Sequence, residues 1–171
     1  MSGSVCLAAY ILRYFGQDYE GKSILALGCG IGITEIDFTY EQLTGVDIFD
    51  YSEHFHGKFI QADVKDIKEL FEEDSFDYVI GVDIIEHLEK EEGFQLLKDA
   101  EAIAQKLVYF YTPIEWSANE QESESWGYGN PALDHKSLWT PYDFNKEEFF
   151  SVLPFPKTDS GGYVAVKNLV G

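Results

Sequence analysis

Five short apolar runs restrict the fold more than any other feature of this sequence. Each run is rich in β-branched or aromatic residues and lacks the clean polar alternation of a strand with one face in water. Runs of this kind are typical of strands covered on both faces, as in a parallel sheet. They are SILALG, QLTGVDI, KFIQADV, FDYVIGVD and KLVYFYTP, at residues 23–28, 42–48, 58–64, 76–83 and 106–113.

Helical patterns before and between these runs predict an α/β fold. We expect an opening helix at about residues 5–15 and a longer helix at residues 88–105, on which Phe94, Leu97 and Ile103 fall near one face. Two last strand-like runs, at residues 149–155 and 162–170, are separated by turn residues and indicate an antiparallel hairpin. The prediction is a three-layer Rossmann-like sandwich with a mostly parallel seven-stranded sheet and a C-terminal antiparallel hairpin.

The size and charge of the chain limit what it can bind. Its 171 residues fit one domain, 1–171. The net charge of −19, from 12 basic and 31 acidic residues, opposes binding to nucleic acid or to an anionic membrane surface. A neutral or cationic small molecule meets no such barrier, and a second copy of the chain, in a homodimer, stays open as a protein partner.

The start of the chain and its cysteines favour the cytoplasm. The apolar stretch VCLAAYIL has no basic region before it and is too short to span a bilayer. Cys6 and Cys29 are too few for a disulfide framework or a zinc site, so we expect both thiols to be reduced.

The first run leads directly into three alternating glycines, Gly28, Gly30 and Gly32. A turn so rich in glycine lets the backbone approach a ligand closely, because no side chain stands in the way. The spacing departs from the G-x-G-x-x-G of dinucleotide-binding folds, because position 33 is isoleucine. The turn alone therefore leaves three alternatives: a dinucleotide, a second class of cofactor, or a purely structural corner.

Acidic residues lie at or next to the ends of the following three runs. Asp47 comes 19 residues after Gly28, about where a carboxylate can accept hydrogen bonds from ribose hydroxyls. Asp63 ends the third run, where an adenine amine could be recognised, and Asp83 ends the fourth run beside the glycine turn. A row of acids at the strand ends opposes a pyrophosphate and favours a cation.

Together, these motifs resemble the class I S-adenosylmethionine-dependent methyltransferases. The resemblance rests on ILALGCGIG, Asp47, Asp63, FDYVIGVDIIEHL and the terminal hairpin, and it covers essentially the whole chain. One departure is Ala26, where the family usually has an acid, which weakens the expected contact with the amino group or sulfonium of the cofactor.

The resemblance implies S-adenosylmethionine as the cofactor and S-adenosylhomocysteine as the product. In that family the glycine turn passes the methionine part, the acid after the second strand holds the ribose, and the acid after the third strand contacts adenine. Asp83 would lie near the amino group or the substrate. The implied cofactor-binding residues are Gly28, Cys29, Gly30, Gly32, Asp47, Ile48, Asp63, Val64 and Asp83.

A segment without clear periodicity, about residues 112–142, follows the fifth run and carries Trp116, Trp126 and Trp139. We interpret it as a lid or substrate loop, with a packed surface loop as the alternative. Its Asn-Pro, His135 and Trp139 resemble a subset of small bacterial and archaeal methyltransferases, some of which are associated with sugars or polysaccharides.

Few residues need be catalytic, because a sulfonium is a good leaving group and the protein mainly aligns the reactants. We predict His135 as a base or substrate ligand, with a histidine that merely pins the lid as the alternative. Asp83 and His87 are the other predicted catalytic residues. His54 and His56 lie in a polar loop and are expected at the surface.

Asp83, Glu86 and His87 have the spacing D-x-x-E-H, which offers ligands for a divalent cation. Similar E-x-x-E-H clusters occur in metal-assisted O-methyltransferases, whereas Glu-His at this place is also widespread in methyltransferases that use no metal. We expect catalysis without a metal, and the cation stays the alternative.

The sequence thus predicts an enzyme that methylates a small molecule, on a hydroxyl oxygen of a sugar or related metabolite. One alternative is a subunit that binds S-adenosylmethionine without catalysis. Another is an RNA 2′-O-methyltransferase, which the scarcity of basic residues disfavours.

Overall fold

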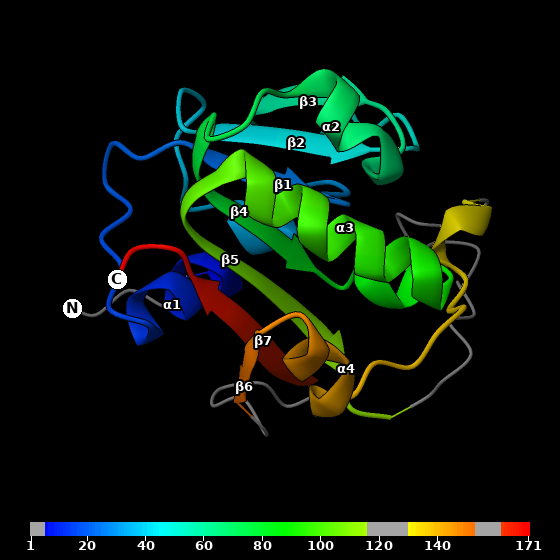
Figure 1. Cartoon of the computed structure of the whole chain (residues 1–171). Helices are drawn as coiled ribbons and strands as arrows, with labels where there is room; N and C mark the ends of the chain where they lie inside the picture. Colours follow the sequence, from blue (N-terminus) through cyan, green and yellow to red (C-terminus); the bar gives the residue numbers. More distant parts are fainter. Residues whose placement is uncertain (1–5, 116–129, 153–161) are drawn as a thin grey trace.

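A computed structural model of the chain describes residues 6–115, 130–152 and 162–171. Their strands form one seven-stranded sheet, and helices cover both of its faces (Figure 1). The strand order is β3-β2-β1-β4-β5-β7-β6. Neighbours from β3 to β5 run parallel, whereas β7 runs antiparallel to both β5 and β6. The predicted fold class, a mostly parallel sheet with a C-terminal antiparallel hairpin, is confirmed.

Each predicted apolar run coincides with one strand, although the fifth strand begins two residues before its run. The parallel strands are β1 (Ile24–Leu27), β2 (Leu43–Asp47), β3 (Lys58–Gln61), β4 (Phe76–Val82) and β5 (Ala104–Pro113). The antiparallel pair consists of β6 (Phe150–Val152) and β7 (Gly162–Asn168). Because β7 lies between β5 and β6, this pair extends the sheet beyond its parallel part.

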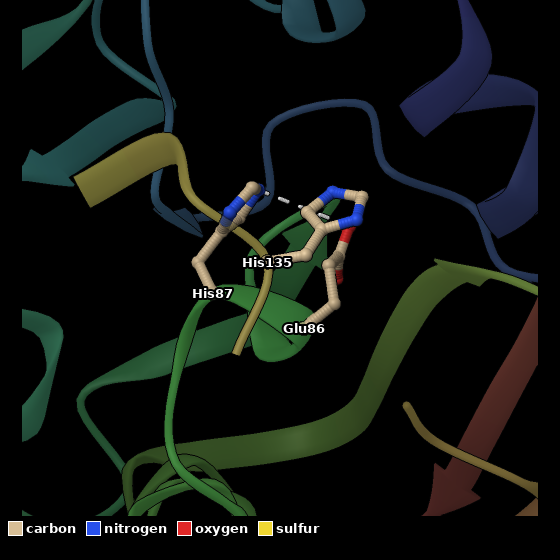
Figure 2. A group of neighbouring side chains, drawn as sticks. All are labelled: Glu86, His87 and His135. Carbon is tan, nitrogen blue, oxygen red and sulfur yellow. Dashed lines mark ion pairs between the residues drawn. The ribbon is translucent and has the colours of Figure 1, made fainter. Parts of the chain in front are cut away.

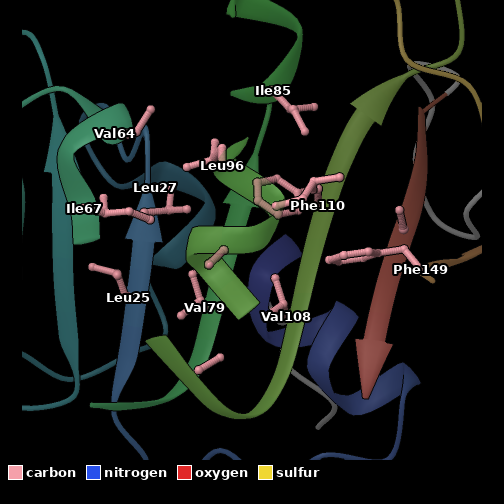
Figure 3. Close-up of a cluster of buried hydrophobic side chains, with 14 of the residues drawn as sticks. Leu25, Leu27, Val64, Ile67, Val79, Ile85, Leu96, Val108, Phe110 and Phe149 are labelled. Atoms are coloured by element: carbon pink, nitrogen blue, oxygen red, sulfur yellow. The ribbon is translucent and has the colours of Figure 1, made fainter. Parts of the chain in front are cut away.

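The side chains of β1 alternate between the two faces of the sheet. Leu25 and Leu27 belong to the core under α2 (Ile67–Leu70) and α3 (Lys90–Ile103), part of which is shown in Figure 3. Ile24 and Ala26 belong to the core on the opposite face, under α1 (Leu7–Tyr14). A fully buried Leu or Ile contributes about 1.5–3 kcal/mol, so the strand is held from both sides, in three layers.

Both predicted helices are present, with small shifts of their ends. On α3, Leu97 and Ile103 are fully buried and Phe94 packs against the same core, as predicted. The helix ends at Ile103, because Ala104 already has the extended backbone with which it pairs with Phe76 in the sheet. Between β1 and β2, the described helical structure is a single 3₁₀ turn, η1 (Ile33–Glu35).

The described part of the predicted lid includes the 3₁₀ turn η4 (Pro131–Leu133) and α4 (Pro141–Lys146). Trp139 is buried there, whereas Trp116 and Trp126 lie outside the described residues. Among the described helices, none is long and apolar enough to cross a membrane.

Candidate active site

The glycine turn after β1 needs glycine for two physical reasons. Gly28, Gly30 and Gly32 all have positive φ angles, of 62°, 51° and 79°, which side chains disfavour. A Cβ atom on Gly28 would also lie 2.5 Å from the side chain of Ile84. The turn is held against the neighbouring strand, because the Gly28 amide donates to the carbonyl of Val46 over 2.8 Å.

A pocket opens above this turn, at the carboxyl ends of β1, β2 and β4. Every cofactor-binding residue predicted from the sequence lines it, as do His87 and the described lid residues Asn130, Ala132, Leu133 and Lys136. The glycine turn, three strand ends and the lid segment therefore share one cavity, although their roles in binding stay predictions. The predicted lining residues are Gly28, Cys29, Gly30, Gly32, Asp47, Ile48, Asp63, Val64 and Asp83.

Asp47 connects the glycine turn to the end of β2. Its Oδ2 accepts a hydrogen bond from the Gly30 amide, and its Oδ1 accepts one from the Phe49 amide, each over 3.0 Å. Burial raises the pKa of Asp47, and these backbone bonds oppose that shift. Because each carboxylate oxygen can accept a second bond, the side chain can hold the turn and still accept hydroxyl groups from the pocket.

Asp63 lines the same pocket and begins the 3₁₀ turn η2 (Val64–Asp66). Its Oδ1 accepts from the Lys65 amide over 3.0 Å, and its Oδ2 lies 3.6 Å from Lys65 Nζ. The same ammonium group pairs with Glu92 Oε1 at 3.1 Å. Asp63, Lys65 and Glu92 therefore form a polar part of the pocket lining, of which the sequence motifs predicted only Asp63.

Asp83 and Glu86 place two carboxyl groups side by side at the end of β4. Asp83 is held at φ 52°, an unusual angle for a residue with a side chain, and its amide donates to the carbonyl of Tyr111 over 2.9 Å. Asp83 is open to the pocket, yet the surrounding protein still raises the pKa of its carboxyl to about 6.

Glu86 is 2% exposed and hydrogen-bonded to both Asp83 and Thr112. Burial, together with the charge of Asp83, holds the pKa of Glu86 well above its usual range. The pair therefore shares a proton, as two adjacent carboxyl groups without a counterion must.

His87 and His135 complete this group (Figure 2). His87 belongs to the 3₁₀ turn η3 (Ile85–His87), and the two imidazole rings have centroids 4.9 Å apart. His87 Nδ1 lies 3.3 Å from the carbonyl of Asp134, and His87 Nε2 lies 4.0 Å from Glu86 Oε1. Burial lowers the pKa of His87, which favours the neutral ring.

The structure thus joins two motifs that the sequence analysis treated separately. One ligand atom from each of Glu86, His87 and His135 lies within 4.8 Å of the others. The three predicted catalytic residues, Asp83, His87 and His135, surround Glu86. His54 is exposed, as expected, whereas His56 is half-buried, with Nε2 3.1 Å from the carbonyl of Glu35.

His135 is held in place by the chain that follows it. The amides of Lys136 and Ser137 donate to the carbonyl of Glu86 over 2.8 and 3.1 Å. Ser137 Oγ donates to the carbonyl of Leu88, and Trp139 Nε1 donates to Ser137 Oγ. The lid segment is therefore anchored to η3 and to Leu88 through its backbone and through the hydroxyl group of Ser137.

Comparison with known proteins gives this pocket a context. A family model described as a methyltransferase domain matches residues 5–147. No curated protein matches the chain in sequence.

Several solved structures share the fold. A SAM-dependent methyltransferase from Archaeoglobus fulgidus is 18% identical, with a TM-score of 0.66 over 97% of this chain and 95% of that chain. The 1,6-didemethyltoxoflavin-N1-methyltransferase of Burkholderia thailandensis, solved with its substrate and S-adenosylhomocysteine, is 17% identical, with a TM-score of 0.64 over 95% and 76%.

The magnesium protoporphyrin IX methyltransferase of Synechocystis, solved with SAM, is 12% identical, with a TM-score of 0.59 over 95% and 77%. At identities this low, the structural likeness to these three proteins shows a common fold alone. Because the family model covers most of the chain, the protein belongs to the methyltransferase-domain family, as its motifs predicted.

Proposed function

We propose that the protein transfers a methyl group from S-adenosylmethionine to a hydroxyl oxygen of a small molecule, such as a sugar or a related metabolite. The observation that carries this proposal is one pocket with two kinds of wall. The glycine turn, Asp47 and Asp63 form one side, whereas Asp83, His87 and the lid segment form the other.

The first wall fits an adenosyl cofactor with a positive charge. Gly28, Gly30 and Gly32 present backbone without side chains to the pocket, and Asp47 keeps acceptor capacity for ribose hydroxyls. Asp63 and Val64 are assigned to adenine, and Asp83 is assigned to the substrate rather than to the amino group of the cofactor. The acids that line this pocket would repel the pyrophosphate of a dinucleotide and attract a sulfonium or ammonium group.

Structural neighbours support the same cofactor. The B. thailandensis enzyme was solved with S-adenosylhomocysteine, and the Synechocystis enzyme with SAM. When bound, S-adenosylmethionine supplies a methyl group on a positively charged sulfur, which leaves as a neutral thioether. What remains for the chain is to align the acceptor with that methyl group and to take up a proton.

The second wall fits a hydroxyl acceptor. We assign Asp83, which lines the pocket and whose pKa is raised by burial toward that of a general base working near neutral pH, to take the hydroxyl proton. His135 would position the acceptor oxygen, and the neutral His87 would hold His135 in place through ring contact. A hydroxyl group needs such a base, because its proton must leave as the carbon–oxygen bond forms.

Calorimetric titration with S-adenosylmethionine, S-adenosylhomocysteine and NAD tests the cofactor. We expect micromolar binding of the two adenosyl ligands and none of NAD. The absence of adenosyl binding would overturn the proposal. Formation of S-adenosylhomocysteine with a panel of sugars and polyols then separates an enzyme from a binding subunit.

We predict that Asp47→Ala weakens S-adenosylhomocysteine binding about ten- to hundredfold, because ribose hydroxyls lose a charged acceptor worth about 1.5–3 kcal/mol. The variant also releases the Gly30 amide, so it loosens the turn that faces the cofactor. The matched control is Asp50→Ala, at an exposed position nearby, which should bind like the wild type. Equal affinity of the Asp47 variant and the wild type would count against the assignment of ribose to Asp47.

A further inference from the structure

We propose that Glu86, His87 and His135 bind a divalent first-row transition-metal ion beside the methyl-transfer pocket. The carboxylate and the two imidazoles converge from η3 and from the lid segment (Figure 2). Their candidate ligand atoms all lie within 4.8 Å of one another. Nitrogen and oxygen ligands sit about 2.0–2.2 Å from such an ion, so closing the site requires the side chains to move inward by on the order of half to one ångström.

The hydrogen bonds around the group orient its ligand atoms inward. His87 Nδ1 faces the carbonyl of Asp134, and only a protonated nitrogen can donate to a carbonyl, so the lone pair of the neutral ring lies on Nε2. That Nε2 faces Glu86 Oε1. Thr112 Oγ1 donates to the other oxygen, Oε2, over 3.1 Å, and because a carboxylate oxygen has two lone pairs, Oε1 keeps one for an ion even beside Asp83. Outer hydrogen bonds of this kind fix metal-binding histidines and carboxylates in other proteins.

The charge of the group also favours a cation. Glu86 is almost fully buried, and Asp83 contacts it with a second carboxyl group. Both groups can be ionised together only if a positive charge lies between or beside them. A divalent ion at Glu86 Oε1 would supply that charge.

The ligand types select among cations. Mg²⁺ prefers six oxygen ligands, often including several waters. Two imidazoles and one carboxylate suit Mn²⁺, Fe²⁺, Co²⁺ or Zn²⁺ and leave coordination positions open. His87 and Asp83 line the pocket, so open positions would face the acceptor. The geometry therefore favours the alternative that the sequence analysis ranked second, because it adds His135 to the D-x-x-E-H residues.

The role of the ion in catalysis rests on the proposed function. An acceptor hydroxyl that binds at an open position would have a lowered pKa and a fixed direction. Its proton would pass to Asp83, its oxygen lone pair would form the new bond to the methyl carbon, and the electrons of the broken carbon–sulfur bond would stay on sulfur. In this arrangement His135 serves as a metal ligand, and Asp83 remains the base.

The test uses the full chain without a histidine tag, stripped with a chelator and titrated with Co²⁺. We expect one equivalent to bind, with visible absorption bands, and Mg²⁺ to bind at least about tenfold more weakly. His135→Ala and Glu86→Gln should each weaken Co²⁺ binding at least about tenfold. His54→Ala, an exposed histidine, is the matched control and should bind Co²⁺ like the wild type.

Circular dichroism of each variant confirms that it is folded; half-buried His135 is the site whose loss the fold should tolerate best. Absence of saturable Co²⁺ binding, or unchanged binding by His135→Ala, would overturn the cation site. S-adenosylhomocysteine binding in the presence of chelator separates this failure from a failure of the proposed function. Co²⁺ binding without S-adenosylhomocysteine binding would support the cation site and contradict the proposed methyl transfer.

Discussion

Glu35 lies in η1, directly after the glycine turn, and is only 3% exposed. Thr34 Oγ1 donates to Glu35 Oε1 over 2.6 Å, whereas Oε2 has no hydrogen-bond partner among the described residues. Burial, with a smaller contribution from the charge of Asp83, raises the pKa of Glu35 to about 7. A buried carboxylate with one unsatisfied oxygen is costly, so ionised Glu35 destabilises the fold.

We therefore expect Glu35→Gln to reduce the pH dependence of stability. The folded pKa lies above the ordinary value of 4.5, so the folded state binds more protons between these two values. The free energy of unfolding then falls as the pH rises through this window. As the pH rises from 4.5 to 8, the free energy of unfolding of the variant should therefore increase relative to that of the wild type by up to about 3 kcal/mol.

Urea unfolding at the two pH values measures this difference. Glu41→Gln, at an exposed position, is the control and should show the same pH dependence as the wild type. If the free energies of unfolding of Glu35→Gln and the wild type differ by the same amount at both pH values, the raised pKa of Glu35 is contradicted.

At the level of single residues, the sequence predicted the side chains that follow strands but not those that meet across the fold. Asp47, Asp63 and Asp83 could be placed together because the carboxyl ends of parallel strands meet at one edge of a sheet. The contact between His87 and His135 could not, because 48 positions separate them and no local pattern links them. It arises from backbone hydrogen bonds to Glu86, which any residue types could make.

At the level of elements, the contact between α3 and Trp139 holds the lid segment. The indole is 1% exposed and packs against Phe94 and Phe144, with Lys90 Nζ 4.4 Å from its ring centre. Gly93 makes room for it, because a Cβ at this position would lie 2.2 Å from Trp139 Cζ2. A glycine inside a helix is thus explained by a neighbour 46 residues away.

This contact predicts opposite effects of one substitution in two backgrounds. In a helix interior alanine is favoured over glycine by about 1 kcal/mol. In the wild type, Gly93→Ala should nevertheless lower the free energy of unfolding by about 1–3 kcal/mol, because the indole is forced to move. In a Trp139→Leu background, Gly93→Ala should instead raise the free energy of unfolding by up to about 1 kcal/mol.

A double-mutant cycle by urea unfolding measures both effects. Hydrogen exchange of the amides at residues 136 and 137 should increase in Gly93→Ala, since the bonds to Glu86 depend on the same anchor. Equal effects of Gly93→Ala in the two backgrounds would rule out the indole as the cause.

The strands were predictable because each is a continuous apolar run, whereas the connection between β1 and β2 was less so. Open α/β folds usually place a full helix after the first strand. The helical structure of residues 28–42 is instead η1 alone, and both Ile33, on this turn, and Ile36, directly after it, are exposed. Glycine and the β-branched residues Ile33, Thr34 and Ile36 have low helix propensity, and this explains the short turn, although the alternation of elements alone gave no sign of it.

At the level of the whole molecule, half of the 12 basic side chains lie next to acids. Six lysines in the described ranges have Nζ within 3.9 Å of a carboxylate oxygen, which reduces the positive charge that they present to solvent. They are Lys65, Lys68, Lys90, Lys98, Lys106 and Lys167.

This charge distribution predicts that the protein does not bind nucleic acid. Non-specific complexes, with dissociation constants of about 10⁻⁴–10⁻⁶ M, depend on lysines and arginines that neutralise phosphates. A net charge of −19 acts against every such contact, and low salt strengthens the repulsion. Labelled single- and double-stranded RNA should therefore show no saturable change in fluorescence anisotropy with up to about 100 µM protein at low salt. Micromolar binding that weakens as salt is added would contradict this expectation and favour an RNA hydroxyl as the methyl acceptor, because phosphate contacts would then have overcome the repulsion.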